Sequence, residues 1–196
     1  MDSGLLRILR WVLVAFGIML FLAIIVLLFT RPSQNKNGSG STEQKPATTA
    51  TYATTGSMRF IQTGNVTAPE NHYVVTITIS NSSRMVEIYN GYGKPPTTSQ
   101  SFANNQASYD AFLGALQGNG FMNTREAKEG VTFDTYCTLG IRYSYQILTG
   151  TDTPLNSWNA SCNTKSGTFA GSTGQVQQLF RNQIPNYNTI VNGVRL

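Results

Sequence analysis

The feature that most constrains this chain is an uninterrupted apolar run near its N-terminus. Residues 11–29, WVLVAFGIMLFLAIIVLLF, contain no charged side chain. A helix of this length spans roughly 28 Å, which matches a bilayer hydrocarbon core of about 30 Å. Lipid offers no hydrogen-bond partner to open backbone groups, so such a run is helical in a membrane. We therefore predict a transmembrane helix over residues 11–30 that holds the protein in the lipid bilayer.

A cleaved signal peptide is the alternative interpretation of the same run. The apolar region of a signal peptide is normally about 7 to 15 residues long, and a small-residue cleavage site follows it. Here the run is longer, and Thr30, Arg31 and Pro32 follow it in place of an A-x-A pattern. An uncleaved, single-pass signal anchor is therefore the favoured interpretation.

The orientation of this anchor depends on charges that are nearly balanced. Arg7 and Arg10 precede the span, and Arg31 and Lys36 follow it. The positive-inside rule therefore decides little. The N-terminal tail is short, and the C-terminal part is poor in charge and contains two cysteines. We therefore predict a single-pass protein of the cell membrane, with residues 1–10 cytoplasmic and the C-terminal domain extracytoplasmic.

The remaining chain divides into a linker and a domain. Residues 31–57 contain almost no large apolar side chain and no periodicity, which predicts a disordered tether that could carry glycans on its threonines. Residues 58–196 are long enough for one domain with its own core. This domain carries nine Lys/Arg and seven Asp/Glu without a basic cluster. The composition therefore argues against a nucleic-acid partner.

Alternating side chains predict the first part of a sheet. Residues 73–80, YVVTITIS, place apolar side chains on one face and Thr or Ser mostly on the other. A polar turn follows, and residues 85–89 return as the partner strand. Asn104 or Asn105 then caps a helix that ends at Gly118. Its apolar stripe is Tyr109, Phe112, Leu113 and Leu116.

A similar pattern recurs in the second half of the domain. Residues 136–148 and 157–162 read as strands, and Ser172 or Thr173 caps a second helix that Pro185 stops. The apolar stripe of this helix is Val176, Leu179, Phe180 and Ile184. The predicted class is α+β, with an antiparallel sheet packed against two helices. A Phe-Ala pair precedes both helices at an offset of 67 residues. Either a β-β-α unit is duplicated, or this pair recurs by chance.

The chain contains two cysteines, Cys137 and Cys162. If the strands around them pair antiparallel, the two residues face each other on core-facing positions, and Leu139 lies opposite Ala160. A disulfide there would contribute roughly 3 kcal/mol in the chain-entropy model. The alternative is two buried free thiols, as in a cytosolic domain. No metal site is expected, because two cysteines and one distant histidine do not form a ligand set.

No residue pattern points to catalysis or to a cofactor. His72 is the single histidine, it precedes a strand, and no G-x-S-x-G motif accompanies it. Glu87, Glu126, Glu129 and Asp134 show no spacing that a glycosidase would require. We therefore predict no cofactor and a non-enzymatic role.

One loop is the candidate binding site. Residues 90–96, NGYGKPP, hold Tyr92 between two glycines. Tyr89 directly precedes this segment, and Lys94 follows the second glycine. Tyrosine offers a wide contact area at low entropic cost and recurs at binding hot spots. Two interpretations compete: Tyr89, Tyr92 and Lys94 contact a partner, or Tyr92 folds back onto its own sheet.

Three functional classes follow, in order of preference. The first is a membrane-anchored extracytoplasmic module that binds a protein or an envelope polymer at the cell surface. The second is a structural subunit of an envelope assembly of the secretion or pilus type. The third is an envelope hydrolase, which would need two carboxylates with shifted pKa values across a cleft.

Overall fold

The computed structural model describes residues 48–196. The predicted tail at residues 1–10, the predicted span at residues 11–30 and most of the predicted linker lie outside the described residues. Within the described part of the chain, no helix combines the length and the apolar character needed to cross a bilayer.

The centre of the fold is a six-stranded antiparallel sheet with the strand order β4-β3-β2-β1-β5-β6. The strands are β1 (Gly56–Thr63), β2 (Tyr73–Ile79), β3 (Ser83–Asn90), β4 (Thr98–Ala103), β5 (Arg142–Thr149) and β6 (Asp152–Ala160). The helices are η1 (Thr49–Tyr52), η2 (Pro69–Asn71), α2 (Gln106–Gly118), α3 (Thr173–Asn182) and α4 (Tyr187–Ile190). The predicted α+β class is confirmed.

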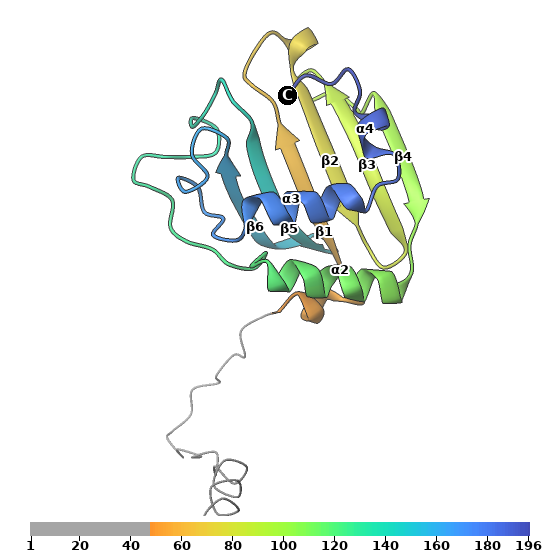
Figure 1. The fold of residues 1–196 in the computed structure, drawn as a ribbon. Helices are drawn as coiled ribbons and strands as arrows, with labels where there is room; N and C mark the ends of the chain where they lie inside the picture. Colours follow the sequence, from red (N-terminus) through yellow and green to blue (C-terminus); the bar gives the residue numbers. More distant parts are fainter. Residues whose placement is uncertain (1–47) are drawn as a thin grey trace, which may run out of the picture. The chain divides into compact units, whose positions relative to one another are not determined.

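Helices cover one face of the sheet, which we call the closed face (Figure 1). Because side chains alternate along a strand, each strand sends every second residue to this face. The ring of Phe60 on β1 lies 5.5 Å from that of Phe180 on α3, and Phe180 lies 5.2 Å from Phe112 on α2. The fully buried sheet residues of this core are Met58, Phe60, Val75, Ile77, Ile79, Val86, Tyr145 and Ile147.

Both principal helices form where the sequence predicts them. The side chain of Asn105 accepts a hydrogen bond from the backbone N–H of Ser108 at 2.9 Å, which caps α2. Ser172, one of the two predicted caps, is the N-cap residue of α3, but its side chain makes no capping hydrogen bond. The predicted stripe of α2 is buried throughout, and in α3 Val176 and Phe180 are buried. The periodic apolar stripes therefore identify the helix faces that meet the sheet.

The domain begins earlier than predicted. Residues 48–57 were assigned to the linker, but they form η1 and the start of β1. Thr49 is 1% exposed, and its hydroxyl donates to the carbonyl of Leu113 at 2.9 Å. Its backbone N–H donates to the side-chain oxygen of Gln117 at 3.0 Å. A short polar side chain can be buried when a neighbouring helix supplies its acceptors, and a hydrophobicity pattern does not reveal this.

Two strands are absent from the sequence-based assignment, and two have different bounds. The strands β1 and β4 were not predicted, β5 begins at Arg142 instead of residue 136, and β6 spans Asp152–Ala160 instead of residues 157–162. The exposed β4 has no apolar alternation because it is an edge strand. Four strands precede α2, whereas two strands lie between α2 and α3. The order of elements therefore does not repeat as it would in a duplicated unit.

Candidate functional site

The second face of the sheet, which we call the open face, is covered over its β5 and β6 half. The ring of Trp158 on β6 packs edge-on against Phe133 at 5.8 Å and lies tilted against Tyr136 at 6.3 Å. The guanidinium group of Arg142 on β5 lies over the ring of Phe133 at 5.3 Å. The segment before β5 thus folds onto this half and leaves the β1–β3 half uncovered.

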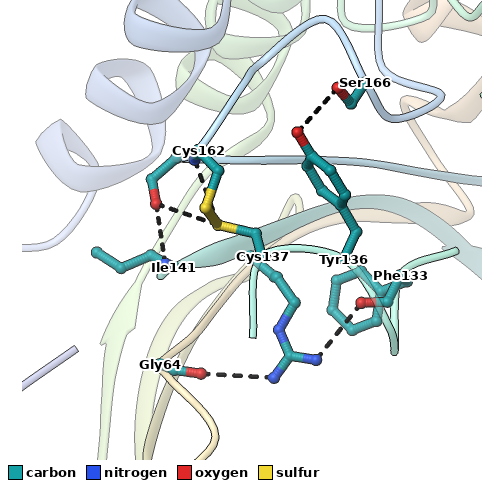
Figure 2. Close-up of a disulfide and its surroundings, with 9 residues drawn as sticks. Gly64, Phe133, Tyr136, Cys137, Ile141, Cys162 and Ser166 are labelled. Atoms are coloured by element: carbon teal, nitrogen blue, oxygen red, sulfur yellow. Dashed lines mark hydrogen bonds between the residues drawn. A yellow bond between two sulfur atoms is a disulfide. The ribbon is translucent and has the colours of Figure 1, made fainter. Parts of the chain in front are cut away.

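A disulfide between Cys137 and Cys162 ties this covering segment to the end of β6 (Figure 2). The two Cα atoms are 5.8 Å apart, within the range that a disulfide requires. The hydroxyl of Tyr136 accepts a hydrogen bond from Ser166 at 3.0 Å beside it. The predicted pairing of the two cysteines is confirmed.

The predicted position of this disulfide on core-facing strands is wrong. Cys137 lies in a turn before β5 with a φ of 56°, and Cys162 lies in a turn after β6. Ala160 pairs with Arg142, not with Leu139, whose side chain is 86% exposed. A side chain at Gly140 would meet the Cys137 sulfur at 2.6 Å, so the turn needs a glycine here. The structure of residues 136–141 is therefore set by the geometry of this turn. The alternation of apolar side chains along the segment does not predict it.

The uncovered half of the open face forms a groove of about 420 Å³ over β1, β2 and β3. Its lining consists of strand residues that face away from the helices, together with the loop after β3: Arg59, Ile61, His72, Val74, Thr76, Glu87, Tyr89, Gly91, Tyr92, Gly93 and Lys94. The register places Ile61 opposite Thr76 and Thr76 opposite Glu87, so these residues form one row across the three strands. Ile61 and Val74 give the groove an apolar centre, and charged side chains also contribute to its lining.

Tyr92 forms one wall of this groove and is held in place while it remains accessible. Its side chain is 48% exposed. The phenol hydroxyl donates to the carbonyl of Thr67 at 2.9 Å and accepts from the N–H of Thr67 at 3.2 Å. The ring stacks on His72 at 4.1 Å between centroids, and His72 Nδ1–H donates to the carbonyl of Asn65 at 2.9 Å. Tyr92 thus neither folds into the core nor moves freely.

The loop around Tyr92 uses a backbone that favours glycine. Gly91 has a φ of 89° and Gly93 a φ of 64°, both in the left-handed region. A side chain at Gly91 would also approach the methylene groups of Lys94 at 3.1 Å. Lys94 therefore lies along the loop and lines the groove, with its Nζ 3.5 Å from the same position at Gly91.

The groove brings together three polar groups of different charge. Arg59 donates through Nε to the hydroxyl of Thr78 at 3.3 Å. The pKa of Tyr89 is raised, first by burial and then by the negative charge of Glu87, while the positive charge of Arg59 opposes this shift. The Tyr89 hydroxyl therefore lies in the fields of both charges and is neutral at physiological pH.

An apolar rim, Val66, Tyr92 and Leu139, lies at one end of the sheet. These are the three exposed large apolar side chains within residues 48–196, with exposures of 47%, 48% and 86%. Hydrogen bonds connect their loops: Val66 N–H donates to the carbonyl of Thr138 at 2.7 Å, and Tyr92 bonds to Thr67. Strand β1 runs from η1 to this end, so the rim lies at the opposite end of β1 from η1. Figure 1 shows the course of β1.

The three sequence-predicted binding residues, Tyr89, Tyr92 and Lys94, line the same groove. Sequence reasoning did not associate Arg59 and His72 with them. Arg59 was missed because β1 was not recognised, although residues 58–60, Met-Arg-Phe, already alternate. His72 was interpreted as a loop residue, and nothing in the linear sequence indicates that Tyr92 stacks on it.

In comparisons with known proteins, no family model, no curated protein and no solved structure matches this chain. Within residues 48–196, no group of three His, Cys, Asp or Glu side chains is placed to hold a metal ion.

Proposed function

We propose that this protein is a single-pass membrane protein whose extracytoplasmic domain is a non-catalytic binding module. The groove and the apolar rim form its contact surface for a partner at the cell surface or in the envelope. The observation that carries this proposal is that Val66, Tyr92 and Leu139 are exposed on loops that hydrogen bonds join at one end of the sheet. Soluble domains normally scatter exposed apolar side chains singly, and clustering marks interaction sites.

The way in which these side chains are held supports a binding role. A residue that is already ordered before binding loses less conformational entropy when the partner arrives. Tyr92 is fixed by Thr67 and His72, and the disulfide restrains the turn that presents Leu139. An exposed but restrained aromatic residue beside a groove is typical of a binding hot spot.

The chemistry of the groove favours a protein partner over an envelope polymer. The apolar centre at Ile61 and Val74 suits an aliphatic or aromatic side chain. Arg59 and Lys94 suit a carboxylate, and Glu87 suits a cationic group. A polypeptide segment supplies all of these groups within a few residues, whereas a neutral polysaccharide supplies none of the apolar bulk.

The location outside the cytoplasm is a separate part of the proposal. It is supported by the Cys137–Cys162 disulfide, since such bonds persist in oxidising compartments. Protease added to intact cells should remove the domain and leave the anchor. Complete protection of the domain in intact cells, with cleavage after lysis, would contradict this location.

The binding role is tested by pull-down with the intact, detergent-solubilised protein. A partner that the wild-type chain recovers should be lost with Tyr92→Ala and with Leu139→Ser. Lys94→Ala in the groove should weaken recovery of the partner. Lys165→Ala is its matched control and should leave recovery unchanged, because both lysines are exposed and only Lys94 lines the groove. Equal recovery by Tyr92→Ala and the wild type, from a folded variant, would rule out this surface.

A further inference from the structure

The two edges of the sheet are protected to different degrees. An edge strand presents unpaired backbone N–H and C=O groups that can pair with another strand, and proteins block such edges with proline, charge, bulges or covering loops. Edge strand β6 shows this protection. Pro154 lacks an N–H, and the N–H and C=O of Trp158 bond to Thr168 and Phe169 at 3.0 and 2.9 Å.

Edge strand β4 has no comparable protection. Its sequence, TSQSFA, contains neither a proline nor a charged residue. The N–H of Asn104 donates to the carbonyl of Ser82, so the even-numbered residues of β4 bond to β3. In an antiparallel ladder, the intervening residues then direct their N–H and C=O away from the sheet. Within residues 48–196, no turn, loop or side-chain hydrogen bond reaches these outward-facing groups of Ser99 and Ser101.

One neighbouring contact limits the length of this free edge. The guanidinium group of Arg84 donates to the carbonyl of Ala103 at 2.9 and 3.2 Å, which occupies the next outward-facing oxygen. The unoccupied window therefore runs from Ser99 to Ser101, centred on Gln100, and all three residues are exposed.

We propose that β4 pairs antiparallel with β4 of a second copy of this protein, about a two-fold axis that passes through Gln100. The window reads Ser-Gln-Ser, which is the same in both directions. The backbone N–H and C=O of Ser99 in one copy then hydrogen-bond to those of Ser101 in the other. The two-fold axis repeats this pair with the two copies exchanged. These two hydrogen-bonded pairs use all four outward-facing groups of each copy. A two-fold interface requires such a self-complementary patch.

This dimer would make one continuous antiparallel sheet of the two six-stranded sheets. The two Gln100 side chains would face each other in a non-hydrogen-bonded pair, with a Cα separation of about 4.5 Å. The inference rests on β4 alone and is independent of the groove and of the apolar rim.

Cysteine cross-linking of the full-length protein in the membrane tests this proposal. The native cysteines are bonded to each other, so an introduced cysteine is the free thiol among residues 48–196. Gln100→Cys should form a disulfide-linked dimer under mild oxidation. Thr153→Cys, an exposed position on the protected edge strand β6, is the matched control. We expect Gln100→Cys to cross-link about tenfold faster or more, because pairing raises the local thiol concentration.

Two blocking variants separate this pairing from association through other parts of the chain. Ser99→Pro removes an outward-facing N–H without removing a bond to β3, and Ser101→Lys places a charge in the window. In the Gln100→Cys background either change should reduce the rate to that of Thr153→Cys. Circular dichroism and the Cys137–Cys162 bond report that the domain is folded.

Three results would overturn the proposal. The first is an equal cross-linking rate for Gln100→Cys and Thr153→Cys. The second is a fast Gln100→Cys rate that persists in both folded blocking variants. The third is a cross-link from Gln100→Cys to a different protein in place of a second copy, which would assign β4 to a heterologous partner strand.

Discussion

The two faces of the sheet differ in how their side chains are held. On the closed face, Phe60, Phe112 and Phe180 interlock at ring separations of 5.2 to 5.5 Å, with no exposure above 3%. On the open face, Tyr92 depends on two hydrogen bonds and one stacked ring. One face is held by burial of apolar area, and the other by a few directional contacts and one covalent bond.

This difference explains why stability and binding can reside on opposite sides of the same strands. Residue 60 contributes to the core while residue 59, its neighbour, lines the groove. Burial stabilises in proportion to the area removed from water, whereas a partner needs area that is still exposed. Substitutions on the two faces should therefore have different effects on the free energy of unfolding.

The largest effect is expected on the closed face, from Phe180→Ala. The ring of Phe180 is fully buried and contacts the rings of Phe60, Phe112 and Phe121. Removing it should lower the free energy of unfolding by about 3–5 kcal/mol through lost transfer energy and a residual cavity. Urea unfolding followed by near-ultraviolet circular dichroism measures this loss. The open-face control Ile61→Ala should lower the free energy of unfolding by only about 1 kcal/mol, because the Ile61 side chain is half-buried. Equal losses for the two variants would contradict the comparison.

The next effect is expected from removal of the disulfide by Cys137→Ser with Cys162→Ser. The bond closes a loop with a sequence separation of 25, for which the chain-entropy model predicts a loss of about 3 kcal/mol. The unfolding midpoint in urea measures it. Reduction of the wild-type protein should reproduce the same shift, and a variant as stable as the wild type would show that the turns around residues 137 and 162 hold themselves.

A smaller effect is expected from Tyr145→Phe on the closed face. The Tyr145 hydroxyl donates to the side-chain oxygen of Asn159 at 3.3 Å and accepts from Gln177 Nε2 at 3.2 Å. Its loss should cost about 1–2 kcal/mol at neutral pH, because two buried polar groups lose their partner.

The same variant should alter the alkaline limb of the stability profile. Burial raises the pKa of Tyr145 above that of an unfolded tyrosine. A raised pKa in the folded state means that this contribution to stability is complete below about pH 10 and falls above it, by about 1.4 kcal/mol per pH unit. Tyr145→Phe should make this decline shallower. Burial also raises the pKa of Tyr109, so part of the decline in stability should remain in this variant. An unchanged slope would contradict the assignment to Tyr145.

The smallest effect is expected from Tyr92→Phe on the open face. This change removes both hydrogen bonds to Thr67 and retains the ring on His72. The free energy of unfolding should fall by about 0.5–1 kcal/mol, since the groups released on Thr67 can bond to water. Thermal unfolding measures this change. A loss of several kcal/mol would mean that Tyr92 is a structural residue and would remove the main support for the binding surface.

The success of sequence-based prediction follows burial in the core with one exception, the central strand β1, which was missed although its residues alternate between buried and half-buried positions. Strand β2 and helices α2 and α3 pack directly on the core, so their apolar periodicity survives in the sequence and predicts them. The edge strand β4 and the segment of residues 136–141 have little buried surface. Their structure depends on pairing partners and on a turn around Gly140, which periodicity does not report.

The candidate site was predicted only in part for a related reason. Tyr92 and Lys94 stand out locally, because glycines and prolines surround them. Arg59 and His72 reach the same groove from other strands and loops. Their proximity depends on the register between β1 and β2, which pairs residues separated by a long loop.

The sequence by itself determined the α+β class, the two helices with their buried stripes, and the partnership of Cys137 with Cys162. These follow from local periodicity, from capping residues and from the presence of two cysteines among the 196 residues. The tertiary structure alone decided that the disulfide joins turns, that half of the open face stays uncovered, and that Val66, Tyr92 and Leu139 meet at one end. Those outcomes depend on contacts between segments far apart in the chain. Strand register and turn geometry set these contacts, and neither can be inferred from the residues of a single segment.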